Sequence, residues 1–217
     1  MDRILYTYFR SSAAYRVRIA LNLKGLTATQ IPVHLVRDGG EHLKPEYKAI
    51  NPQGLVPVFG EDGMRISQSL SILEYLEEQY PGTPLLPAGA ADRARVRQLA
   101  LVVACEIHPL NNLRVLKYLS GTLGVAETAK NDWIKHWIAE GFVALEAELT
   151  ATGSGAGKFC FGDTPTIADC CLVPQLFNAR RFEVDLSPYP TLVAIDERCQ
   201  ALPAFQQAHP SQQPDAQ

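Results

Sequence analysis

The chain has 217 residues, of which 47% are hydrophobic, and a formal net charge of −3 at pH 7. This length and composition suit a globular protein of one or two domains with a sizeable core. A charge so close to neutral argues against a general nucleic-acid binder or a binder of membrane surfaces. No apolar run approaches the roughly 20 residues that span a bilayer.

The cysteines indicate the compartment. There are five of them, an odd number, and none shows CxxC spacing; they are Cys105, Cys160, Cys170, Cys171 and Cys199. We expect them to be buried thiols in a reducing environment. The first residues lack the apolar stretch of a signal peptide, so a cytoplasmic protein is expected.

The first 80 residues mix strand and helix patterns. Alternating side chains at residues 4–8 predict a strand, and Val17, Ala20 and Leu21 share one face of a helix that Gly25 ends. The remaining predicted elements are a strand at 29–35, a loop at 38–40, a short helix at 43–50, strands at 55–59 and 64–67, and a helix for which Ser69 is the expected N-cap. The order βαβαββα predicts an α/β domain over residues 1–81.

A segment rich in proline and glycine follows, and it predicts a linker at 82–91. Beyond it no convincing strand pattern occurs. Long helical stretches are expected at 93–119 and 127–149, and Thr166 with Asp169 predicts a capping box that opens a further helix. We therefore expect an all-helical domain over 92–217, with a loose tail after His209.

The most informative segment is Arg10-Ser11-Ser12, which joins the first strand directly to the first helix. Two hydroxyl groups, a guanidinium and the unbonded N–H groups of a helix start meet there. This combination can hold an anion and lower the pKa of a thiol. Because the chain's own cysteines lie elsewhere, the thiol is expected to come from a ligand.

Two further segments have polar potential. Pro57 lies inside a strand-like run, which an edge strand or a cis Val56–Pro57 bond explains equally well. A cis bond turns the Val56 N–H and C=O outward, where they can pair with a ligand amide. Gln68 and Ser69 open the third helix and suit a ligand carboxylate, although Ser69 can also be a simple N-cap. A short peptide with a central cysteine and free carboxylates matches all three segments.

These residues make the chain similar to the zeta class of glutathione transferases. Val-Pro and Gln-Ser alone mark the wider superfamily, whereas the Arg-Ser-Ser helix start and the Val-Pro-Gln and Arg-Phe segments are much more specific. The matching segments span nearly the whole chain and are Tyr8-Phe9-Arg10-Ser11-Ser12, 16–21, Asn51-Pro52-Gln53, Val56-Pro57, Gln68-Ser69, 74–78, 85–87, 108–112, Gly162-Asp163, Ala168-Asp169, 172–175, Arg181-Phe182, 184–186 and 188–190.

The resemblance implies a thioredoxin-like N-terminal domain, an all-α C-terminal domain, a homodimer and glutathione as cofactor. Ser11 would hold the glutathione thiolate with help from the helix start at Ser12, Val56 would pair with the cysteinyl backbone, and Pro57 would be cis. The resemblance assigns the remaining glutathione contacts to His42, Gln53, Gln68, Ser69, His108, Asn111 and Asn112. The family often has Ser-Ser-Cys at the helix start, but this chain has Ala13, so no mechanism can use a protein thiol there.

The activity implied is glutathione-dependent cis–trans isomerisation of maleylacetoacetate, a dicarboxylic keto acid, by reversible thiolate addition to its C=C bond. Arginines suit the substrate carboxylates and a developing enolate. Arg10 and Arg181 are the expected catalytic and substrate-binding arginines, and Arg114 and Arg180 are further substrate-binding candidates. Three alternatives remain: maleylpyruvate as substrate, conjugation or dehalogenation of α-halo acids, and a non-catalytic binding protein of the same fold.

Overall fold

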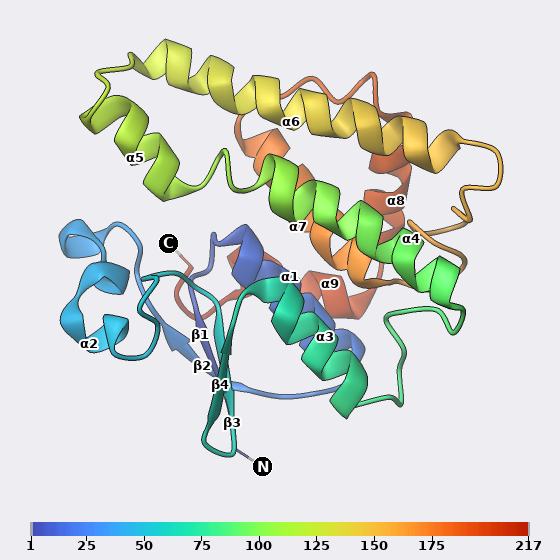
Figure 1. The fold of residues 1–217 in the computed structure, drawn as a ribbon, viewed down its shortest axis with the longest axis horizontal. Coiled ribbons are helices and arrows are strands. Elements are labelled where there is room, and N and C mark those ends of the chain that lie inside the picture. The colour runs from blue at the N-terminus through green and yellow to red at the C-terminus, as the bar shows by residue number, and fades with distance from the viewer. Residues whose placement is uncertain (1, 217) are drawn as a thin grey trace. The chain divides into compact units, whose positions relative to one another are not determined.

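The structure, a computed structural model, describes residues 2–216 (Figure 1). It divides into two compact units. Unit 1 runs to Leu85 and includes the residues from Ala201 onward, and unit 2 is Leu86–Gln200. The segment from Ala201 onward was expected in the helical domain, but its contacts are with the N-terminal unit.

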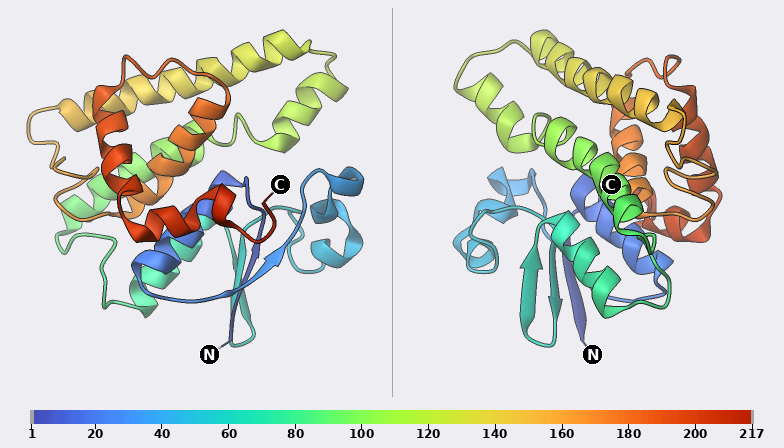
Figure 2. Two further views of the ribbon diagram at one scale, coloured as in Figure 1. Left: turned by 180° about the vertical axis from the view of Figure 1, so that it is seen from behind. Right: turned by 45° about the vertical axis from the view of Figure 1, so that its right-hand side comes forward.

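Unit 1 is built on a four-stranded sheet in the order β2-β1-β3-β4. β1 pairs in parallel with β2, and the β1–β3 and β3–β4 pairs are antiparallel. Helices α1, α3 and α9 cover one side of this sheet, and α2 lies on the other side (Figures 1 and 2). The predicted order βαβαββα is confirmed. The elements are β1 (Arg3–Thr7), α1 (Ser12–Leu23), β2 (Thr29–Pro32), 3₁₀ turns at Arg37–Gly39 and Glu41–Leu43, α2 (Pro45–Lys48), β3 (Val58–Glu61), β4 (Met64–Ser67), α3 (Ser69–Gln79), α9 (Pro203–Ala208) and a 3₁₀ turn at Pro210–Gln212.

Two strands are shorter at one end than predicted, because side chains bind the backbone there. β2 ends at Pro32, and beyond it Nδ1 of His34 accepts hydrogen bonds from the N–H groups of Val36 and Arg37, which turns the chain. β3 begins only at Val58. The carbonyl oxygen of Leu55, three residues earlier, accepts from the Tyr47 hydroxyl at 2.7 Å and from Asn51 Nδ2 at 2.8 Å.

The C-terminal segment is packed, so the expectation of a loose tail was wrong. Asn22 Nδ2 in α1 donates to the carbonyl oxygen of Ala204 in α9 at 2.9 Å. Farther along, the buried Gln213 side chain donates to the carbonyl oxygens of Gln207 and His209, both at 2.9 Å. These bonds involve residues whose polar composition alone predicts an unstructured segment.

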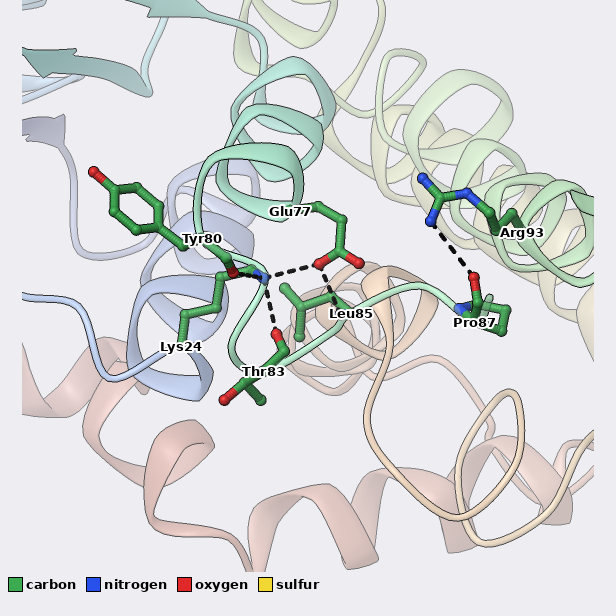
Figure 3. Close-up of polar contacts among 7 residues, drawn as sticks. All are labelled: Lys24, Glu77, Tyr80, Thr83, Leu85, Pro87 and Arg93. Atoms are coloured by element: carbon green, nitrogen blue, oxygen red, sulfur yellow. Dashed lines mark hydrogen bonds and ion pairs between the residues drawn. The ribbon is translucent and has the colours of Figure 1, made fainter. Parts of the chain in front are cut away.

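The first part of the predicted linker is also tied down. Lys24 is the C-cap residue of α1, and its buried Nζ contacts Glu77 Oε2 at 2.8 Å and the carbonyl oxygens of Tyr80 and Thr83 at 2.9 and 2.8 Å (Figure 3). The same Glu77 oxygen accepts the N–H of Leu85 at 2.8 Å. Residues 80–85 are therefore fixed to unit 1 by one buried ion pair.

Unit 2 is all-helical, as expected. Its elements are α4 (Ala90–Leu101), a π-helical stretch (Val102–Ile107), α5 (Leu113–Gly121), α6 (Glu127–Thr150), α7 (Ile167–Arg181) and α8 (Pro190–Gln200). No helix within residues 2–216 is long and apolar enough to cross a membrane.

The single helix predicted over 93–119 is interrupted at residues 108–112. Pro109 has no N–H to donate and its ring opposes a continuing helix. Asn112 then starts α5 afresh, because its Oδ1 accepts the N–H of Arg114 at 3.1 Å. The second predicted helix, α6, runs almost as expected.

The capping box of α7 is confirmed. Asp169 is fully buried and accepts from the Thr166 N–H at 2.7 Å, the Thr166 hydroxyl at 2.8 Å and the Cys160 N–H at 2.8 Å. Burial of this carboxyl raises its pKa, and the hydrogen bonds from Cys160 and Thr166 oppose that shift. Four of the cysteines are buried as expected, whereas Cys105 is exposed.

The close contact between α6 and the π-helical stretch yields a stability prediction. A Cβ on Gly141 would lie 2.2 Å from Cγ1 and 2.3 Å from Cδ1 of the fully buried Ile107. Gly141→Ala must displace this side chain, so we expect the free energy of unfolding to fall by about 1–3 kcal/mol. Gly121→Ala is the matched control, because among the described residues nothing lies within 4 Å of a Cβ added there. Urea denaturation measures both, and equal effects would contradict the steric explanation.

Candidate functional site

The strand register brings three predicted segments to the same end of the sheet, where β1 and β4 end and β3 begins. Tyr6 in β1 pairs with Val58 in β3, and Val58 pairs with Ser67 in β4. The carboxyl end of β1, the residues before β3 and the end of β4 therefore lie side by side. Arg10-Ser11-Ser12, Val56-Pro57 and Gln68-Ser69 extend from these three positions.

Ser11 is the N-cap of α1. Its N–H donates to the carbonyl oxygen of Tyr8 at 2.9 Å, which closes a tight turn, and its Oγ accepts the N–H of Ala14 at 3.2 Å. The hydroxyl hydrogen of Ser11 can therefore point to a ligand. The N–H groups of Ser12 and Ala13 have no partner inside the helix and carry its positive end. This is the donor set that an anion or a thiolate requires.

Arg10 precedes this cap and is exposed to solvent. Its guanidinium lies over the ring of Phe9, with Cζ 4.8 Å from the ring centroid. The position leaves the charged group accessible at the helix start.

The Val56–Pro57 peptide bond is cis, which decides between the two explanations of the proline. Val56 is buried in the cluster that Tyr8, Phe9 and Tyr47 also form. Within residues 2–216 neither the N–H nor the C=O of Val56 has a hydrogen-bond partner. Two adjacent backbone groups beside the helix start can thus pair with an extended peptide.

At the third segment the N-cap is Gln68 and not Ser69, so that part of the prediction was wrong. Gln68 has φ 72° and ψ 115°, and Ser69 is the first helical residue. The Gln68 side chain donates from Nε2 to Gln53 Oε1 at 2.8 Å, which brings a fourth predicted residue to the same end of the sheet. The left-handed backbone of Gln68 is costly for a residue with a side chain, and such strain is typical of binding sites.

Ser69 is held from beneath by a buried arginine. Nη1 of Arg16, a side chain of α1, donates to Ser69 Oγ at 3.1 Å. Positive charge therefore underlies the start of α3, and it favours a carboxylate ligand at this end of the site.

His42 lies in a neighbouring loop of unit 1 and is buried. The loop is tightly packed at two glycines with positive φ. A Cβ on Gly40 would lie 2.5 Å from His42 Cε1, and one on Gly54 would lie 2.9 Å from the His42 carbonyl oxygen. These close approaches fix the His42 ring and backbone next to the segment that carries Gln53.

In unit 2 the predicted residues His108, Asn111, Asn112 and Arg114 gather around the helix break at 108–112. Asn112 caps α5, and Arg114 is exposed. The side-chain amide atoms of Asn111 are buried and have no hydrogen-bond partner among the described residues. Asn112 therefore has a structural task, whereas the Asn111 amide remains available to a ligand.

The two neighbouring arginines at the end of α7 differ. Arg180 forms an ion pair with the buried Asp196, with Nη1 2.7 Å from Oδ2. Burial raises the pKa of Asp196, and the charge of Arg180 opposes that shift. Arg181 is exposed and lies over the Phe182 ring at 4.8 Å. The geometry gives Arg180 a structural partner in Asp196.

Three residues near the helix start were not among the predicted site residues: Arg16, Arg18 and Asp215. The two arginines fall within a helix whose other residues are mostly apolar, and this is the sequence signal that could have suggested buried partners for them. Asp215 lies 206 residues from its partner Phe9, and no local pattern connects them.

Comparisons with known proteins agree with these features. A family model described as the N-terminal domain of glutathione S-transferase matches residues 5–84, and one for the C-terminal domain matches 131–207. The chain is 52% identical over 216 residues to a probable maleylacetoacetate isomerase of Vibrio cholerae, covering 100% of this chain and 99% of that protein.

Solved structures extend the similarity to three dimensions. One is the holo structure of a maleylpyruvate isomerase described as a bacterial zeta-class glutathione S-transferase, with TM-score 0.95, 51% identity and coverage of 99% and 100% of the two chains. Another is a maleylacetoacetate isomerase of Methylobacterium extorquens AM1 with bound malonate and GSH, with TM-score 0.94, 43% identity and 99% coverage of each chain. The expected two-part fold is thereby confirmed.

Proposed function

Since this chain belongs to the glutathione S-transferase family and to its zeta class, we propose that it is a glutathione-dependent cis–trans isomerase that acts on maleylacetoacetate. The proposal rests on three features that lie at the same end of the sheet. They are the Ser11 helix start, the unpaired Val56 backbone and the Gln68–Ser69 helix start. The similarity to proteins named maleylacetoacetate and maleylpyruvate isomerase also supports the proposal, because this chain is about half identical to them over nearly its whole length.

The donor set fits glutathione. The Val56 N–H and C=O would pair with its cysteinyl backbone, and Gln68 and Ser69, with Arg16 behind them, would bind the γ-glutamyl carboxylate. Gln53 and His42 would bind the glycyl end. When bound, glutathione would supply the thiolate nucleophile of the isomerisation.

Ser11 and the helix start would keep that thiol ionised. The Ser11 hydroxyl would donate to the sulfur, and the N–H groups of Ser12 and Ala13 would add the positive end of the helix. With Ala13 in place of a cysteine, the protein contributes no thiol of its own at this point.

Positive side chains would receive the dianionic substrate. Arg10 stands next to Ser11, and Arg181 ends α7 with an accessible guanidinium. Guanidinium groups bind carboxylates through bidentate hydrogen bonds and can stabilise the enolate that develops during isomerisation. A relative that was solved with malonate is consistent with a dicarboxylate ligand.

One assay tests the proposal. Purified protein is mixed with maleylacetoacetate or maleylpyruvate, with and without glutathione, and formation of the fumaryl isomer is followed by chromatography. We expect isomerisation only with glutathione, and faster with maleylacetoacetate. Absence of glutathione-dependent isomerisation of both acids would refute the function. Halide release from α-halo acids measures the conjugating side activity.

We also propose a cytoplasmic homodimer. Support comes from the family membership and from the thiols, which suit a reducing compartment. Size-exclusion chromatography with light scattering should give twice the 23.9 kDa chain mass. A mass of one chain at micromolar concentration would contradict the dimer.

Gln68→Gly should separate stability from binding. Glycine adopts φ 72° without strain, so the variant is expected to gain about 1 kcal/mol of stability. Loss of the side-chain amide should weaken glutathione binding by about tenfold or more. Asp62→Gly is the control, because Asp62 also has positive φ but lies in the β3–β4 turn. Titration calorimetry measures the glutathione affinity of both variants, and thermal unfolding measures their stability. Equal loss of affinity in the two variants would contradict the assignment of Gln68 to glutathione binding.

Arg181→Ala should impair binding and turnover of the keto acid without changing the binding of glutathione. Loss of a charge-assisted hydrogen bond is expected to lower kcat/KM for the keto acid about 10- to 100-fold. The affinity for glutathione should stay the same. Arg198→Ala, which removes an exposed arginine of α8, is the matched control. Unchanged kcat/KM in Arg181→Ala would remove this residue from the site.

A further inference from the structure

The turn that presents Ser11 is held by Asp215 from the far end of the chain and by Arg18 of α1. The N–H of Phe9 donates to Asp215 Oδ2 at 2.9 Å, and the carbonyl oxygen of Phe9 accepts from Arg18 Nη2 at 3.0 Å. Both backbone polar groups of this residue are thus bound by charged side chains. Phe9 lies within the turn that the Ser11 N–H closes on Tyr8.

Arg18 connects this turn to the C-terminal segment. Its side chain is buried, with Nη1 donating to Thr7 Oγ1 at 3.1 Å and Nε donating to the carbonyl oxygen of Ala208 at 3.0 Å. Burial lowers the pKa of Arg18 to about 10, whereas the charge of Asp215 opposes that shift. The carboxylate thus helps to keep the buried guanidinium charged.

Asp215 is itself held in place. The side chain of Gln213, two residues earlier, accepts from Gln30 Nε2 at 3.1 Å and donates to two carbonyl oxygens of its own segment. The second oxygen of Asp215, Oδ1, is buried and has no hydrogen-bond partner within residues 2–216. The carboxylate is therefore directed at the Phe9 N–H as its one hydrogen-bonded contact there.

Building on the proposed function, we infer that Asp215 and Arg18 are positioning residues that clamp the Phe9 peptide groups and so set the place of Ser11 at the thiolate. Both side chains bind backbone groups of the turn. They act through the backbone of the turn, since a shift of Phe9 moves the cap hydroxyl two residues later. Displacements of about 1 Å at a reacting group can cost up to 100-fold in rate.

Three variants test the clamp. Asp215→Ala removes the acceptor of the Phe9 N–H, Asp215→Asn keeps an acceptor oxygen, and Glu146→Ala is the matched control. Glu146 also accepts a backbone N–H at 2.9 Å, from Thr191, but within unit 2. The readouts are amide hydrogen exchange over residues 8–14, the pKa of the bound glutathione thiol from thiolate absorbance, and kcat and KM.

In Asp215→Ala the amide hydrogen of Phe9 should exchange faster with solvent. The pKa of the bound thiol should rise toward that of free glutathione, and kcat should fall by about tenfold or more. Asp215→Asn should stay close to wild type. Glu146→Ala should lower the melting temperature while leaving the thiol pKa unchanged.

The outcomes distinguish this inference from the proposed function. Wild-type exchange in Asp215→Ala would overturn the clamp. Faster exchange with an unchanged thiol pKa and kcat would also overturn it, since the contact would then be purely structural. An asparagine variant that behaves like alanine would overturn the hydrogen-bond explanation. A wild-type protein that binds no glutathione would refute the function and the positioning role together.

Discussion

Ser11→Ala is expected to lower kcat/KM for glutathione-dependent isomerisation by about 100- to 1,000-fold, the usual cost of removing one preorganised donor to a developing or fixed negative charge. The hydroxyl of Ser11 accepts from Ala14, so its hydrogen is available to the sulfur. Without it, the pKa of the bound thiol should rise toward the value near 8.5 of an ordinary thiol. Steady-state kinetics and thiolate absorbance measure both effects.

The same substitution also removes the N-cap of α1, which by itself costs about 1 kcal/mol. Ser11→Asp separates the two roles, because aspartate caps a helix as well as serine does but cannot donate to a thiolate. We expect this variant to melt near the wild-type temperature and to be inactive. Ser11→Thr keeps the hydroxyl and should retain most activity. A Ser11→Ala enzyme with more than half of the wild-type kcat/KM would contradict the assigned role.

The largest stability effect is expected at Asp169. Alanine there leaves the N–H of Cys160 and both donors of Thr166 buried without an acceptor. Unsatisfied buried donors cost about 1–3 kcal/mol each, and losses at such networks commonly total about 3–5 kcal/mol. Since domains are stable by only about 5–15 kcal/mol, we expect Asp169→Ala to be poorly folded at physiological temperature.

Urea denaturation measures this loss, and Asp185→Ala is the matched control. Asp185 also accepts a backbone N–H, that of Ser187 at 2.9 Å, but it is exposed, so water can replace it. Its removal should cost much less stability than removal of the buried Asp169 carboxylate. If the two alanine variants lose the same stability, burial of the Asp169 network is not the cause.

Several features could be predicted from local sequence because local physics decides them. The order of strands and helices in unit 1 follows from side-chain periodicity. The Thr166–Asp169 capping box involves residues three apart, and Ser11 is an N-cap because a serine follows a strand and precedes an apolar helical face. In each of these cases the interacting groups are within one turn of each other.

The helix predicted over 93–119 failed for a local reason, because Pro109 lacks an N–H and Asn112 starts a new helix. Other predictions failed where a distant group competes with the local pattern. Ser69 was expected as an N-cap, but it is the first residue of α3 and binds Arg16 from another helix, while Gln68 takes the cap position with a left-handed backbone. The tail was expected to be loose because its composition is polar, yet Gln213 and Asp215 find partners in α9 and at Phe9.

By itself the sequence determined the order of the strands and helices in unit 1 and the start of α1 directly after a serine, because these properties depend on residues close together in the chain. Only the tertiary structure decided that Val56–Pro57 is cis, that Gln53 meets Gln68, and that Arg18 and Asp215 hold the turn before Ser11. Those features depend on burial and on hydrogen bonds between residues up to 206 positions apart, and no local pattern encodes such partners.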